Sequence, residues 1–185
     1  MIKPYFSAAF CDKSVERESM NKLERSIADE MEAYFKGDSK RIEHAHRVTE
    51  FVQQLLETEP GERAIVIAAG LLHDIGIHEA ERKYASSSGK YQEIEGPPIA
   101  REILGKLSFD PVQIEEICQI IAHHHSPGKI ESRNFKILYD ADWLVNLKDE
   151  FDISDKGKLE KIINKVFLTS SGRRLAGKIY LNQPD

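Results

Sequence analysis

The sequence predicts an all-α protein, a compact bundle of helices, and three observations indicate this fold class. Apolar side chains recur at spacings of three and four residues over most of the chain, the period of a helix with one buried face. Residues that start and stop helices stand at the ends of these stripes. No stretch alternates apolar and polar residues as a half-buried strand does. The length of 185 residues suits one domain.

The first three helices are defined by their apolar stripes and by the residues that end them. One helix is expected over 14–36, before Gly37, and a second from Asp38 or Ser39 to about Leu56. From Arg63 to Gly76 the chain is apolar on every side, which indicates a buried central helix, with a strand as the alternative. The stripe residues are Met20, Leu23, Ile27, Met31 and Tyr34 in the first helix and Ala45, Val48, Val52 and Leu55 in the second.

Loop and cap signals divide the second half of the chain. Residues 85–91 (ASSSGKY) predict a loop, and Pro97-Pro98 are expected to open a helix, because proline suits the first turn. The next helix is expected to begin with Asp110 as its N-cap and Pro111 as its first residue. It is expected to end before Ser126-Pro127-Gly128. Further helices are expected over 135–147, 158–168 and 173–179. We expect a single domain over 1–185, with a core at 40–148 and flanking helices at 14–36 and 155–180.

Composition excludes several classes of function. The 26 basic and 31 acidic side chains give a formal charge of -5, which argues against an extended nucleic-acid surface or an electrostatic membrane binder. The two cysteines, Cys11 and Cys118, lie far apart and outside any CxxC pattern, so neither a disulfide framework nor a thiolate zinc site is indicated. No apolar run approaches the roughly 20 residues of a membrane span. A cytoplasmic location is therefore expected.

Two histidines on the second helix are predicted to differ. His44 shares the apolar face with Val48, Phe51 and Leu55, whereas His46 is rotated from it by about 200° and belongs to the wet side. A histidine on an apolar face is more often a satisfied core residue than a ligand, so His44 alone does not define a site.

His73-Asp74, at the end of the apolar run, have no hydrophobic reason to be there. Burying the carboxylate without compensation is costly, and a divalent cation removes this cost, since imidazole and carboxylate both suit zinc, manganese, iron and nickel. A hydrogen-bonded His-Asp pair at a helix end is the simpler alternative.

Two further groups offer ligands on later helices. His124 and His125 extend the stripe that begins at Ile114, and His123 lies half a turn away; a polar helix end is the alternative. Asp140 and Asp142 both have apolar neighbours three or four residues away, so periodicity does not choose between them.

The ordered set His44, His73-Asp74 and Asp142 resembles the HD superfamily of metal-dependent phosphohydrolases, whose signature is H…HD…D. The segments EHAHRV, GLLHDIG and YDADWL are similar to the family's motifs, and the resemblance covers about residues 40–148. It implies an all-helical fold and metal ligation by these four residues, with Asp142 preferred because the family's aspartate directly precedes such a Trp-Leu pair. The segments QEIEGPPIAREIL and IIAHHH also resemble subgroups with a second metal, for which His124 and His125 would be ligands. Gln92 and Glu95 stand where those subgroups often have histidine.

The resemblance implies hydrolysis of a phosphate monoester, diester or anhydride, perhaps of a nucleotide, through a metal-activated water. The metal is one of Mn, Ni, Co, Zn, Fe or Mg. Asp74 is expected to orient or deprotonate the water, with Glu95 as a second candidate base. Arg47, Lys83 and Lys90 are candidates for binding the phosphate, although a solvated surface charge is the simpler interpretation of each. We expect the segment from Lys83 to Glu95 to be a mobile loop that covers the metal.

Two other functions stay open at this stage. Some proteins of the HD fold are dinuclear iron oxygenases, and a non-catalytic nucleotide-binding regulatory module is a third reading, against which an intact ligand set weighs. The expected partner is a small phosphorylated substrate, with no membrane and no extended nucleic acid, and a homodimer stays open.

Overall fold

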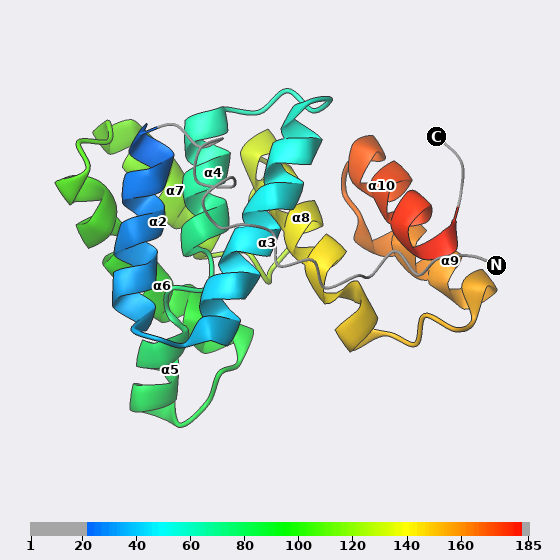
Figure 1. Cartoon of the computed structure of the whole chain (residues 1–185), viewed down its shortest axis with the longest axis horizontal. Coiled ribbons are helices and arrows are strands. Elements are labelled where there is room, and N and C mark those ends of the chain that lie inside the picture. The colour runs from blue at the N-terminus through cyan, green and yellow to red at the C-terminus, as the bar shows by residue number, and fades with distance from the viewer. Residues whose placement is uncertain (1–21, 183–185) are drawn as a thin grey trace.

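The computed structural model describes residues 22–182, and within this range the chain forms nine α-helices and no strand (Figure 1). The predicted all-α fold is confirmed. No helix in this range has the length and apolar character needed to cross a membrane. Residues 14–21 of the first predicted helix, and Cys11, lie outside the described residues. The helices are α2 (Lys22–Phe35), α3 (Ser39–Leu56), α4 (Arg63–Leu72), α5 (Ile77–Tyr84), α6 (Gly89–Lys106), α7 (Pro111–Ile121), α8 (Arg133–Glu150), α9 (Lys156–Val166) and α10 (Ser170–Leu181).

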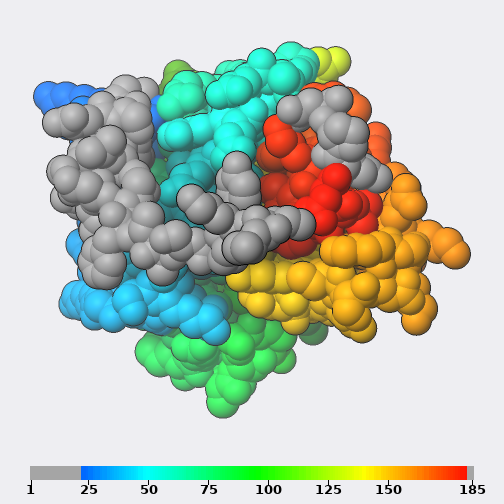
Figure 2. All heavy atoms as spheres, turned by 45° about the vertical axis from the view of Figure 1, so that its right-hand side comes forward, coloured from blue at the N-terminus to red at the C-terminus, as the bar shows by residue number. Residues whose placement is uncertain are grey.

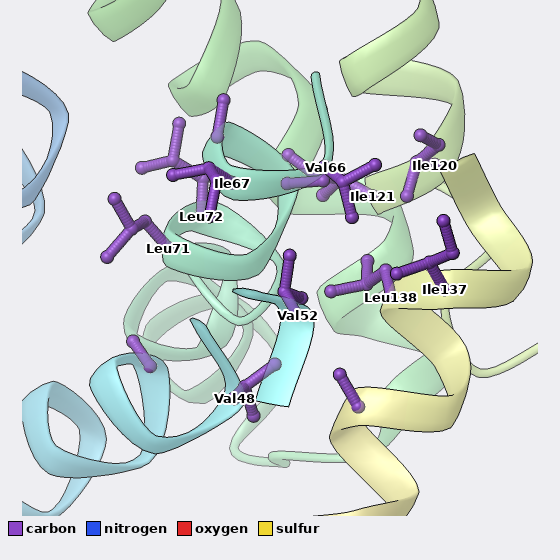
Figure 3. Close-up of a cluster of buried hydrophobic side chains, with 14 of the residues drawn as sticks. Val48, Val52, Val66, Ile67, Leu71, Leu72, Ile120, Ile121, Ile137 and Leu138 are labelled. Carbon is purple, nitrogen blue, oxygen red and sulfur yellow. The ribbon is translucent and has the colours of Figure 1, made fainter. Parts of the chain in front are cut away.

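Helix α4 is the centre of the molecule, as its all-round apolar sequence predicts. Every residue from Ile65 to Leu72 is buried, because α2, α3, α7 and α8 pack around it. Figure 3 shows side chains of α3, α4, α7 and α8 meeting in one cluster. The strand alternative is wrong, and the helix ends at Leu72 rather than Gly76, because residues 73–76 form a turn that leads into α5. His73 and Asp74 therefore lie on a turn anchored to the most buried helix.

The region from Ile77 to Lys106 differs from the prediction. Residues 77–84 form α5, and α6 begins at Gly89, so Pro97 and Pro98 lie inside a helix rather than opening one. Ile94 and Pro98 are exposed, so water can reach the carbonyl group that Pro98 leaves without its helical donor. A mobile loop over Lys83–Glu95 is also wrong, since only residues 85–88 connect the two helices.

The two C-terminal helices are joined to α8 by a buried carboxylate. Asp140 accepts hydrogen bonds from the backbone N–H of Leu168, at 2.7 Å, and from the N–H and Oγ1 of Thr169, at 2.8 and 2.7 Å. Burial raises the pKa of Asp140 to about 6, against these hydrogen bonds. Farther along, the Tyr180 hydroxyl donates to the carbonyl of Leu144. Asp140 is thus committed to a structural role between α8 and α10.

Helix α10 also meets the end of α3. Ser171 binds both Thr58, hydroxyl to hydroxyl at 2.9 Å, and Glu59, whose carboxylate accepts from the Ser171 N–H at 3.1 Å. In the space-filling view α10, in red, lies against the cyan part of the chain (Figure 2). Helices α8 and α10 are two or three residues longer at each end than predicted. Helix α9 begins two residues earlier and ends two residues earlier than predicted.

Gly76 is required by the close approach of α6. A Cβ atom there would lie 2.5 Å from the backbone nitrogen of Gly96 and 2.6 Å from the carbonyl oxygen of Gln92. Because these neighbours are backbone atoms, they cannot move aside as a side chain would. We expect Gly76→Ala to lower the free energy of unfolding in urea by about 1–3 kcal/mol.

Gly105→Ala is the matched control, since Gly105 lies exposed in the same α6 helix and a Cβ there meets nothing within 4 Å. It should raise the stability by about 0.5–1 kcal/mol, because alanine restricts the unfolded chain more than glycine. Equal effects of the two substitutions would contradict the packing of α6 on the turn.

Candidate metal centre

Four side chains from three parts of the fold converge beside α4. His44 comes from the middle of α3, His73 and Asp74 from the turn after α4, and Asp142 from α8. The His44 Nε2 atom lies 3.1 Å from both the Nε2 atom of His73 and the Oδ1 atom of Asp142. The Oδ2 atom of Asp74 is 3.6 Å from both Nε2 atoms. The structure therefore brings together the four residues of the predicted ligand set.

The His73 ring is protonated on Nδ1, so its Nε2 lone pair points toward the other three side chains of the cluster. Its Nδ1–H donates to the carbonyl of Gly70 at 2.8 Å, and burial lowers the pKa of His73, so the ring is neutral. The Nε2 atom then carries a lone pair that faces the Nε2 atom of His44. Two facing nitrogens at 3.1 Å require a proton or a cation between them. A backbone carbonyl that holds the second nitrogen is the usual arrangement of a metal-binding histidine.

The two carboxylates give the centre a negative charge that attracts cations. Burial would raise the pKa of Asp142, but its hydrogen bond to His44, with the electrostatic effect of the neighbouring imidazoles, outweighs this, so the pKa is lowered. Burial would also lower the pKa of His44, yet Asp142 and Asp74 raise it. The group thus favours positive charge at its centre. Two imidazole nitrogens and two carboxylates suit a divalent transition metal, and this donor set fits such an ion.

A second group of potential ligands adjoins the first through Asp74. The ligand atoms of Asp74, His124 and His125 all lie within 4.8 Å of one another. His124 is buried, its Nδ1–H donates to the carbonyl of Ile121 at 2.7 Å, and its Nε2 atom lies 3.6 Å from Oδ1 of Asp74. This Nε2 atom is buried without a hydrogen-bond partner. Gln92 Oε1 lies 3.5 Å from Nε2 of His125, so an amide stands beside this group.

Several predicted residues make contacts with side chains other than the metal-ligand candidates. The Glu95 carboxylate accepts from the Lys83 ammonium at 2.7 Å and from the Tyr84 hydroxyl at 2.8 Å, which lowers its pKa. Lys90 lies over the ring of Tyr91, at 5.8 Å. Arg47 is close enough to Tyr180 to lower its pKa, although burial raises that pKa more strongly. The roles predicted for Glu95, Lys83, Lys90 and Arg47 stay predictions, and the contacts described here involve neither ligand group.

Three other residues mark the limits of the centre. His46 pairs with Glu32, with 2.9 Å between its Nε2 and the carboxylate, on the other side of α3. His123 is half-buried and belongs to neither ligand group. Asp140 is turned toward Leu168 and Thr169, as described above. The side chains of Asp140 and Asp142 therefore have different tasks, a choice that periodicity left open.

A cavity of about 230 Å³ opens beside the ligands and includes residues that the sequence analysis missed. The Asn146 amide donates to Oδ1 of Asp142 at 2.8 Å, and Glu150 lies one turn farther along α8. Their positions four and eight residues after Asp142 place them on the same face of the helix, a spacing that was available in the sequence. The lining residues are His124, His125, Tyr139, Asp142, Trp143, Asn146 and Glu150.

Fold and centre together define a helical protein whose helices bring together a His, His-Asp, Asp set of side chains that could hold a metal ion. The sequence model of the HD domain family matches residues 41–147, and the chain belongs to this family. A crystal structure of a predicted HD superfamily hydrolase from an uncultured Thermotogales bacterium is similar over 85% of both chains, with a TM-score of 0.65 and 26% sequence identity. No curated protein matched the chain significantly.

The two aspartates of α8 allow a paired test of metal binding. Asp142→Asn should weaken Mn²⁺ binding by more than about a hundredfold, since losing even an outer-shell partner costs 10–100-fold. Asp140→Asn should leave the Mn²⁺ affinity unchanged and lower the free energy of unfolding by about 1–3 kcal/mol, because an amide cannot accept all the hydrogen bonds from Leu168 and Thr169. Isothermal titration with Mn²⁺ and urea unfolding measure the two effects.

His44→Ala and His46→Ala provide an independent pair on α3. The first should abolish the thermal stabilisation by Mn²⁺ or Ni²⁺, and the second should leave it within error of the wild type, because His46 pairs with Glu32. If His46→Ala removes the stabilisation and His44→Ala does not, the assignment of the metal centre is wrong.

Proposed function

We propose that this protein is a metal-dependent phosphohydrolase that cleaves a small phosphate ester. The observation that carries the proposal is the cluster in which the His44 and neutral His73 rings and the carboxylates of Asp74 and Asp142 face one another across 3.1–3.6 Å. Such a cluster is stable with a cation at its centre. Membership of the HD domain family and likeness to a predicted HD superfamily hydrolase support the same reaction class.

A divalent cation bound here would polarise a phosphoryl oxygen and lower the pKa of a water molecule. The protein side chains would hold the reactants in place. His73 is fixed by Gly70, and Asp142 by Asn146, so these two ligands have little freedom to turn. Asp74 points one oxygen toward His44 and His73 and the other toward His124, a position from which it can orient an attacking water. The Nε2 atom of His124, 3.6 Å from Oδ1 of Asp74, is placed to exchange a proton with that water.

The cavity beside the centre favours a particular kind of substrate. Among the described residues that line it there is no lysine or arginine, while Glu150 adds a negative charge. Within this cavity the metal would therefore supply the positive charge that balances the phosphate, which favours a single phosphate group over a polyphosphate. Tyr139 and Trp143 offer aromatic surface for the organic part of the ester. A nucleoside monophosphate suits this cavity, with its base against Trp143.

The second group of ligands supports one alternative from another class. Asp74, His124 and His125 would allow a second metal ion, so a dinuclear iron oxygenase of the same fold is the runner-up. Gln92, an amide, lies beside His125 where a histidine would favour iron more strongly. Iron content after purification, with oxygen consumption, distinguishes this alternative from the hydrolase.

The test is a screen of the Mn²⁺-, Co²⁺- and Ni²⁺-loaded chain against nucleoside monophosphates, sugar phosphates, phosphodiesters and inorganic pyrophosphate. We expect release of phosphate from a monoester and little from pyrophosphate. Asp74→Ala should lower kcat/KM by more than about a hundredfold, because it removes a ligand shared by both groups. His46→Ala is the control and should retain full activity.

Absence of turnover with every metal and substrate class would contradict the proposal. Nucleotide binding without turnover would then favour the regulatory module, and oxygen consumption by an iron-loaded chain the oxygenase.

A further inference from the structure

A second cavity, of about 400 Å³, lies near the start of α8, away from the metal ligands. Arg133 is nine residues before Asp142 on this helix, about 13 Å along its axis. Residues of the link between α3 and α4 and of the link between α9 and α10 line the cavity together with α8 and the start of α10. Its lining residues are Glu59, Pro60, Arg133, Lys136, Ile137, Leu168, Thr169, Ser170 and Arg173.

The charge of this cavity is opposite to that of the whole chain. Three of its lining residues, Arg133, Lys136 and Arg173, are basic, although the chain has a formal charge of -5. The acidic member, Glu59, already accepts the backbone N–H of Ser171 at 3.1 Å. Positively charged side chains that line one cavity repel one another, and an anion bound between them reduces this repulsion.

The basic side chains keep donors available for a ligand. Arg133 is exposed and forms no ion pair within the described part of the chain. Lys136 pairs with Glu131 at 2.8 Å, but Glu131 is 77% exposed, so this pair is weak. The Nη1 group of Arg173 donates a hydrogen bond to the carbonyl of Phe167 at 2.7 Å, which holds the guanidinium beside the cavity. Two guanidinium groups and an ammonium are the donor set that recognises phosphate oxygens.

The remaining walls indicate what the phosphate would be attached to. Pro60, Ile137 and Leu168 supply apolar surface, and the exposed Ser170 supplies a hydroxyl at the rim. A free phosphate ion would leave most of the 400 Å³ to water. We propose that this cavity is a second binding site, separate from the metal centre, for the phosphate group of a small phosphomonoester.

The site adjoins the contact that joins α10 to α8. Thr169 lines the cavity and also donates to the Asp140 carboxylate through its N–H and its hydroxyl. A ligand that binds Arg133 and Lys136 of α8 together with Arg173 of α10 bridges the same two helices. Its binding therefore stabilises the attachment of α10, whether or not the metal centre hydrolyses phosphate esters.

The experiment is a calorimetric titration of the full chain in the presence of a metal chelator, so that neither metal-held phosphate nor hydrolysis contributes. Inorganic phosphate and ribose 5-phosphate are the two probes. We expect both to bind, ribose 5-phosphate more tightly, and the doubly substituted Arg133→Ala, Lys136→Ala chain to bind ribose 5-phosphate at least tenfold more weakly. Arg101→Ala is the control, since Arg101 is an exposed arginine of α6 that pairs with Glu115, and it should bind as the wild type does.

Backbone NMR locates the bound probe. The amide signals of Thr169 and Ser170 should shift on titration in the wild type and not in the double variant. Absence of saturable binding at millimolar concentrations, equal affinity of wild type and double variant, or equal loss in Arg101→Ala would each overturn the proposal. Binding of inorganic phosphate with an affinity equal to that of ribose 5-phosphate would overturn the assignment to a phosphomonoester.

Discussion

The structure depends on one electrostatic constraint, the placement of two carboxylates, one buried and one half-buried, next to the neutral imidazole of His73. Asp74 and Asp142 come from different helical regions, and the cost of removing a carboxylate from water would by itself keep both exposed. They are brought inside because α3, α4 and α8 bury their apolar faces against one another, with Val48, Val66 and Leu138 in the same cluster. The apolar core therefore supplies the energy that gathers the charges. A cation at their centre would reduce the repulsion that the core must otherwise overcome.

Much of the fold could be predicted from the sequence, and the failures have a common cause. The helices that carry clear stripes and caps, such as α3 and α7, were predicted within a few residues. The start of α6 was wrong because Pro97-Pro98 favour a first turn locally, whereas the backbone of α6 is held by its close approach to Gly76 and by the contact of Gly96 with Ile121. Such contacts join residues that are distant in the sequence, and local propensity does not contain them.

The metal centre was predictable to a different degree for each residue. The face of α3 distinguished His44 from His46, since only one of them lies on the apolar stripe. For Asp140 and Asp142 both positions are buried, and the distinction depends on Leu168 and Thr169, which lie almost thirty residues farther along the chain. Lys83 and Glu95 were each assigned to the centre by their charge. In the structure they pair with each other, an outcome that composition cannot reveal because either partner alone suggests a function.

The division of tasks between Asp140 and Asp142 also limits how the length of α8 can change. Their side chains leave the helix about 200° apart, so one reaches α10 while the other reaches His44. One residue inserted between them would rotate everything that follows by about 100° relative to what precedes, so the two carboxylates could not both reach their partners. The exposed link of residues 151–155 carries no such restriction. Insertions and deletions in related chains should accordingly collect in that link and be absent from the first half of α8.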